Sequence, residues 1–122
     1  MSPPTPPRSK RLTLEAVGDV VVVGFVDKRI LDEQNIQIIA DQLFSLVDDE
    51  QRRKLLLNFG NVEYMSSAAL GKLITLHKKL TGVRGKLILC GISPQIFEVF
   101  AITKLDKIFK IVKDYDTGLT SF

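Results

Sequence analysis

Two adjacent serines, Ser66 and Ser67, are the residues of this chain whose type and spacing best fit a chemical role. They stand directly before an apolar-periodic run that predicts a helix over residues 67–81. A serine there can cap the helix, because its oxygen accepts a hydrogen bond from a free N–H of the first turn. It can also carry a phosphate, which the same N–H groups and the helix dipole stabilise. The residues leave both roles open, and Ser66 can cap while Ser67 is modified.

The predicted helix contains a glycine, Gly71, one turn beyond Ser67. On a helical wheel, Ser67, Gly71 and Lys78 form a narrow stripe at the border between the apolar and the polar side. Glycine inside a helix costs about 1 kcal/mol relative to alanine, and a half-exposed face gives little core packing that would require it. Close approach by a partner protein would explain Gly71.

The remaining reactive side chains fit the core better than an active site. His77 falls within the apolar stripe of the predicted helix, and Cys90 alternates with Leu87 and Leu89 in an apolar strand. Neither residue stands in the cluster of His, Cys, Asp or Glu that a metal ion requires. We therefore predict no enzyme activity, no cofactor and no metal site.

Length and composition indicate one globular domain in a reducing compartment. The chain has 122 residues, of which 45% are hydrophobic and 25% charged. A net charge of +3 and a pI near 9.1 are too mild for a dedicated nucleic-acid binder. A single cysteine excludes an internal disulfide framework. No apolar run approaches the ~18 residues of a membrane span, and the first residues carry no hydrophobic signal core, so we expect a cytoplasmic protein.

Residues 1–11 differ in composition from the rest of the chain. Four of the five prolines lie within residues 3–7, and Arg8, Lys10 and Arg11 follow them. Such a segment favours a short, extended, poorly ordered and basic arm. It also contains a P-x-x-P match from Pro4 to Pro7, which we interpret as part of that tail. We expect residues 12–122 to form the domain.

Periodicity and capping residues predict the elements of this domain. They are a β-hairpin over 12–26 turning at Gly18 and Asp19, a helix from the N-cap Asp32 to about Val47, a strand over 54–59, the helix over 67–81 ended by a left-handed glycine of "GVRG", a strand over 86–91, a third helix capped by Ser93 with Pro94 in its first turn, a short edge strand over 108–112, and a terminal turn over 116–122. Strands that alternate with amphipathic helices predict an α/β fold with a mixed, mostly parallel central sheet.

The ordered motifs of the chain resemble those of the STAS domain, the module of anti-sigma factor antagonists and of sulfate-transporter tails. The stretch "LLLNFGNVEYMSSAALGKLITLHKKL" resembles the family's buried strand, its D-S-[ST]-G-L motif and the helix that follows. The stretch "VVVVGFVDKRIL" resembles the second strand and the G-x-[LV]-D loop, with Asp27 in register. The stretch "KLILCGISPQIFEVFAITKLDKIFKI" resembles the family's last strand–helix–strand unit. The resemblance covers about residues 12–116.

The resemblance implies a fold, a function and partners. The fold is a mixed sheet of four or five strands with helices largely on one side. The function is partner switching in transcription regulation: the unphosphorylated antagonist binds an anti-sigma factor, usually a serine kinase of the GHKL type, and so frees the sigma factor. That kinase phosphorylates the serine that aligns with Ser67, using its own ATP and magnesium, and a serine phosphatase reverses the step. The antagonist is thus ligand and substrate, without direct contact to nucleic acid or insertion into a membrane.

We expect the partner-binding surface to comprise a small set of residues around that serine. They are Asp27, Ser66, Ser67, Gly71, Thr75 and Lys78.

The chain departs from the family motif at the serine pair itself. Ser66 replaces the family's Asp, Ala68 a small hydroxyl residue and Ala69 a glycine. Ser67 remains the expected phosphorylation site, with Ser66 as the second choice. Two alternative functions stay open: a STAS scaffold that binds without being phosphorylated, and an accessory subunit that docks on the ATPase of an ABC transporter for lipids or solutes. The oligomeric state is not predicted.

Overall fold

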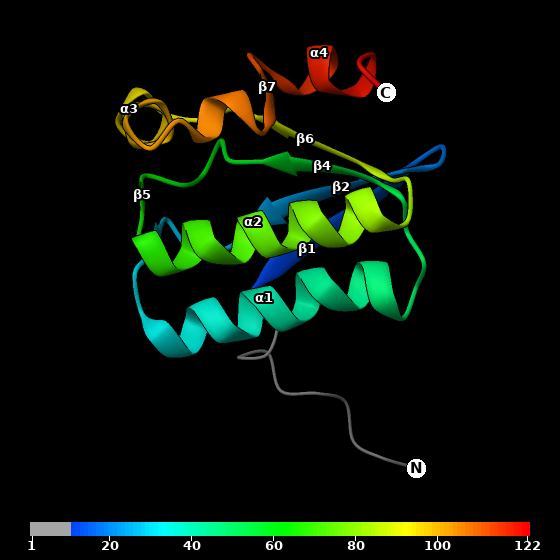
Figure 1. Ribbon diagram of the computed structural model, residues 1–122, viewed down its shortest axis with the longest axis horizontal. Helices are drawn as coiled ribbons and strands as arrows, with labels where there is room; N and C mark the ends of the chain where they lie inside the picture. The colour runs from blue at the N-terminus through cyan, green and yellow to red at the C-terminus, as the bar shows by residue number, and fades with distance from the viewer. Residues whose placement is uncertain (1–10) are drawn as a thin grey trace.

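A five-stranded mixed sheet forms the centre of the computed structural model, which describes residues 11–122 (Figure 1). The arm predicted over residues 1–11 therefore lies, except for Arg11, outside the described residues. The strands are β1 (Leu12–Val17), β2 (Val20–Phe25), β3 (Arg29–Ile30), β4 (Lys54–Asn58), β5 (Tyr64–Met65), β6 (Lys86–Cys90) and β7 (Lys110–Val112). The helices are α1 (Glu33–Asp48), α2 (Ser67–Gly82), α3 (Pro94–Ile102), a 3₁₀ helix over Leu105–Lys107, and α4 (Tyr115–Leu119).

The order of strands in the sheet is β1-β2-β4-β6-β7, with β1 antiparallel to β2 and all other pairs parallel. The predicted hairpin, the mostly parallel sheet and the edge position of β7 are therefore confirmed. β3 and β5, which the sequence did not predict, form a separate two-stranded parallel ladder.

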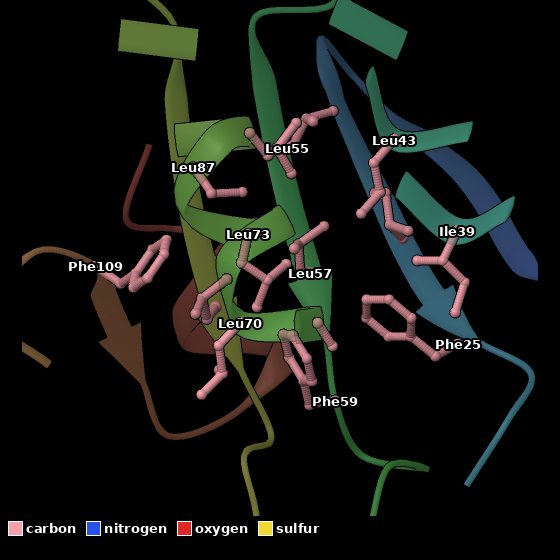
Figure 2. Close-up of a cluster of buried hydrophobic side chains, with 14 of the residues drawn as sticks. Phe25, Ile39, Leu43, Leu55, Leu57, Phe59, Leu70, Leu73, Leu87 and Phe109 are labelled. Atoms are coloured by element: carbon pink, nitrogen blue, oxygen red, sulfur yellow. The ribbon is translucent and has the colours of Figure 1, made fainter. Parts of the chain in front are cut away.

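The three long helices pack against one face of the sheet. α1 and α2 lie side by side along it, and α3 lies near the end at which β6 stops (Figure 1). Alternate strand residues such as Leu55 and Leu57 point toward the helices and are fully buried, as Figure 2 shows. Helices largely on one side of a mixed sheet are the arrangement that the sequence predicted.

The C-terminal segment corrects one prediction, because residues 115–119 form the helix α4 rather than a turn. Asp114 caps α4 by accepting a hydrogen bond from the N–H of Thr117 at 2.9 Å, which lowers the pKa of the Asp114 carboxyl. α4 covers the opposite face of the sheet, where Leu56, Ile88 and Cys90 are buried. A Cβ on Gly118 would lie 2.6 Å from Cδ1 of Leu56, so glycine lets α4 pack closely on β4.

The end of α2 corrects a second prediction. The left-handed residue after α2 is Arg84, with φ of 61°, and not a glycine of "GVRG". Gly85 serves close packing instead, because a Cβ there would lie 2.6 Å from the carbonyl oxygen of Arg53. That carbonyl also accepts a hydrogen bond from Lys86 N at 2.6 Å, at the start of the β4–β6 ladder.

Substitution by alanine of Gly85 and of Gly82, the last residue of α2, should have effects of opposite sign on the free energy of unfolding. Gly85→Ala forces a methyl group against a backbone carbonyl and should lower it by about 1–3 kcal/mol. Gly82→Ala is the matched control: its Cβ meets nothing within 4 Å, so it should raise the value by up to about 1 kcal/mol. Urea unfolding curves measure both, and equal midpoints for the two variants would contradict the proposed role of Gly85.

Candidate functional site

The β3–β5 ladder brings the loop after β2 beside the start of α2. The N–H of Glu63 donates to the carbonyl of Lys28 at 2.7 Å, and the N–H of Ser66 donates to that of Ile30 at 3.1 Å. Asn61 adds a side-chain tie, because its Nδ2 donates to the carbonyls of Phe25 and Val26, each at 3.1 Å. Residues 26–31 and 60–67 therefore form one surface at the carboxyl ends of β2 and β4.

Ser66 is the N-cap of α2, in agreement with the cap interpretation of the sequence. Its backbone is extended, with φ of −81° and ψ of 166°, and its Oγ accepts a hydrogen bond from Ala69 N at 3.3 Å. Its carbonyl accepts the first helical bond, from Leu70 N at 3.1 Å. The hydroxyl of Ser66 is therefore used by the fold.

Ser67 is the first residue within α2 and is exposed to solvent. Its hydroxyl takes no part in the cap, since the capping oxygen belongs to Ser66, and it makes no hydrogen bond to the part of the chain that the structure describes. The N-terminal end of α2 carries the partial positive charge of the helix dipole, and the first turn contains no acidic residue. An anion on Ser67 would thus lie where the helix stabilises negative charge.

The other expected residues of α2 continue from Ser67 along one exposed stripe. Gly71, Thr75 and Lys78 are all exposed, at intervals of four, four and three residues, whereas the opposite face is buried. The Oγ1 of Thr75 donates to the carbonyl of Gly71 at 3.2 Å, so this hydroxyl is partly satisfied within the helix. We call Ser67, Gly71, Thr75 and Lys78 the α2 stripe.

Gly71 has no structural reason to be glycine. A Cβ built on it meets no atom within 4 Å, and the residue is exposed. The helix interior therefore carries a residue of low helix propensity at a position where alanine would fit.

Asp27 is held differently from the α2 stripe. Its Oδ1 lies 3.2 Å from Nη1 of Arg11, and the two side chains are 19% and 25% exposed. Oδ2 of Asp27 and Nε of Arg11 are buried without a hydrogen-bond partner among the described residues, so the two groups form half of a bidentate pair. Sequence reasoning missed this pair, because its members are sixteen residues apart and Arg11 was assigned to the arm.

Exposed apolar side chains around the site were also missed. Val26, Leu31 and Tyr64 are about half exposed on the joined loops, and the guanidinium of Arg29 lies 5.2 Å from the centre of the Tyr64 ring. Loop residues have no periodicity that separates exposed from buried positions, so no sequence signal could have identified them.

Of the two residues assigned to the core, Cys90 is buried, whereas His77 is partly buried and contacts the core residue Phe109. The ring of His77 packs edge-on against Phe109 with 5.4 Å between centroids. Cys90 is buried, and burial, together with the nearby Asp114 carboxylate, raises the pKa of its thiol to about 11. Within residues 11–122 no three His, Cys, Asp or Glu residues gather as metal ligands would. None of the helices in the same range has the length and apolarity of a membrane span.

Comparison with known proteins identifies the family. The family model described as "STAS domain" matches residues 11–118. The chain belongs to the STAS domain family. A protein of Bordetella bronchiseptica named "Putative anti-sigma factor antagonist BtrV" is 27% identical over 112 residues, which cover 92% of this chain and 94% of that protein.

Solved STAS structures show the same fold. The anti-sigma-factor antagonist (STAS) domain protein of Planctomyces limnophilus superimposes with a TM-score of 0.79 at 25% identity, over 90% of this chain and 95% of the other. The Bacillus antagonist SpoIIAA, at 20% identity, gives TM-scores of 0.71 in its phosphorylated and 0.69 in its unphosphorylated form. Each superposition covers 89% of this chain, and 96% and 94% of SpoIIAA respectively.

Ser66→Ala should lower the free energy of unfolding by about 1 kcal/mol, because it removes the capping oxygen of α2. Ser66→Asp should retain the cap, since a carboxylate accepts the same hydrogen bond. Ser67→Ala is the control, because its hydroxyl does not cap the helix. Thermal and urea unfolding of the three variants measure this, and equal losses for Ser66→Ala and Ser67→Ala would contradict the assignment of the cap.

Gly71→Ala should raise the free energy of unfolding by up to about 1 kcal/mol through helix propensity and a less flexible unfolded chain. Gly71→Gln should be nearly neutral, because the position faces open space. Melting temperatures check both variants. A decrease of several degrees for Gly71→Ala would show that the residue is required by the fold.

Proposed function

We propose that this STAS domain is an anti-sigma factor antagonist that acts by partner switching, with Ser67 as the phosphorylated residue. The observation that carries the proposal is the division between the serines: Ser66 caps α2, while Ser67 stands exposed beside it with a hydroxyl that bonds to no residue within 11–122. The names of the relatives support an antagonist role, and the SpoIIAA structures support a STAS fold that accommodates both phosphorylation states.

The partner is an anti-sigma factor that is also a serine kinase of the GHKL type, and it contacts the α2 stripe together with the loops around Tyr64. The kinase brings ATP and magnesium, so the antagonist is ligand and substrate rather than catalyst. Gly71 supports close approach of the partner, because glycine leaves the helix surface open at that point. Exposed Val26, Leu31 and Tyr64 supply apolar contact area beside the stripe.

Phosphorylation of Ser67 would end this contact by electrostatics. A phosphate adds about −1.5 to −2 charge, and at the first residue of α2 the helix dipole stabilises it, so the domain stays folded. In a closed interface the same charge loses its water, which costs free energy unless the partner offers a cation. A serine phosphatase restores the binding form.

Binding titrations of Ser67 variants with the cognate anti-sigma factor test the switch. Ser67→Ala should retain affinity, whereas Ser67→Glu should lower it about a hundredfold, which corresponds to about 3 kcal/mol for an unpaired charge in an interface. Ser67→Gln is the matched control, because it has the size of Glu without the charge. Equal affinities for the Glu and Gln variants would rule out an electrostatic switch.

Mass spectrometry separates the switch from the unphosphorylated scaffold. After incubation with the cognate kinase, ATP and magnesium, the full chain should gain one phosphate on Ser67, and Ser67→Ala should gain none. Binding without any phosphate transfer would favour the scaffold, a function consistent with Ser66 in place of the family's Asp.

A further inference from the structure

A groove of about 670 Å³ runs between the outer strand β1 and helix α1, away from the α2 stripe. It is lined by Leu12, Thr13, Leu14, Asp41, Gln42, Ser45, Leu46 and Glu50. β1 pairs with β2 on one side and ends the sheet on the other, so no strand within residues 11–122 pairs with its second edge. Leu14 is 55% exposed there, a large fraction for a leucine of the sheet. The groove therefore offers apolar surface to a ligand.

The rim of the groove is acidic. Asp41 is exposed, accepts a hydrogen bond from the neutral amide of Gln37 at 2.8 Å, and makes no ion pair within residues 11–122. Glu50 has a cation, Arg52, at 3.7 Å, a distance longer than that of a hydrogen-bonded pair. A fitting ligand combines apolar side chains with at least one positive charge.

The chain itself enters the domain at the wall of this groove. The backbone N–H of Arg11 donates to Oε1 of Gln42 at 3.2 Å, and Gln42 lines the groove next to Asp41. Residues 2–10, directly before Arg11, are "SPPTPPRSK", with four prolines and the cations Arg8 and Lys10. Their composition matches both the apolar floor and the acidic rim.

We propose that the groove binds the chain's own residues 2–10. Four residues of polyproline helix, such as 4–7, extend about 12 Å, close to the rise of about 10 Å along α1 from Asp41 to its last residue, Asp48. Proline rings lack the N–H needed to extend a β-ladder, so they pack on Leu12, Leu14 and Leu46 while Arg8 and Lys10 reach Asp41. Because the segment is tethered at Arg11, its effective concentration is about millimolar, and weak contacts suffice.

Docking would place Arg11 between two sites. Its N–H is bound to the groove residue Gln42, and its guanidinium is paired with Asp27 in the loop beside β3. A docked arm thus restrains Arg11 and, through it, Asp27. Asp27 belongs to the expected partner-binding surface, so an effect of docking on partner binding rests on the proposed function. The docking of residues 2–10 in the groove does not rest on it.

Paramagnetic labelling of the full chain tests the docking. A nitroxide on Ser2→Cys labels the arm selectively, because Cys90 is buried and its thiol has a pKa of about 11. We expect the amide signals of Thr13, Leu14, Gln42 and Ser45 to lose intensity, while those of α3 and α4 do not. Loss spread evenly over the surface, or none in the groove, would overturn the proposal.

A charge variant and a mixing experiment sharpen the result. Asp41→Asn should lower the docked population roughly two- to fivefold, the range expected for one exposed ion pair. Glu98→Gln on α3 is the matched control, with the same charge change at an exposed position outside the groove, and should have no effect.

A mixing experiment distinguishes docking within one chain from docking between chains. Spin-labelled chain at natural isotope abundance is mixed with ¹⁵N chain that carries no spin label. Equal loss in that mixture would assign the groove to a second copy and overturn intramolecular docking.

Discussion

The burial of β4 on both faces is the constraint from which the rest of this structure follows. Leu55, Leu56 and Leu57 are fully buried although successive side chains of a strand point to opposite faces. The sheet must therefore be covered twice, by α1 and α2 on one face and by α4 on the other. The parallel pairing of β4 with β2 also directs both strand ends to the same edge, where the loops carrying Asp27 and Ser67 meet.

The elements that could be predicted from the sequence are those with a strong local signal. The caps Asp32, Ser66 and Ser93 each precede a periodic run, and each accepts a hydrogen bond from the N–H three residues later. α4 escaped prediction because five residues, one of them the glycine Gly118, show no helical period. β3 and β5 escaped because a two-residue ladder depends on tertiary contacts alone. The left-handed conformation falls on Arg84, whereas Gly85 packs against the carbonyl oxygen of Arg53, and local sequence does not distinguish these two roles.

The candidate site likewise contains residues whose positions the sequence predicts and residues whose positions depend on the tertiary structure. Ser67, Gly71, Thr75 and Lys78 follow from helical geometry, so a wheel drawn from the sequence places them on one exposed stripe. The environment of Asp27 could not be predicted from the sequence, because its ion pair with Arg11 joins segments that only the fold brings together. The exposed Val26, Leu31 and Tyr64 likewise depend on where the loops lie. Local periodicity therefore predicts the helical half of the surface, and the loop half needs the tertiary structure.

The separate hydroxyls of Ser66 and Ser67 have a consequence for how such domains diverge. The capping bond of α2 comes from Ser66, and no buried side chain belongs to the α2 stripe. Substitutions along the stripe therefore remove no core contact and no capping bond, so their cost in folded protein is small. After gene duplication, copies of this domain can diverge in sequence on that surface while their core residues remain the same. Related modules in one cell can in this way become insulated from each other's partners without a new core.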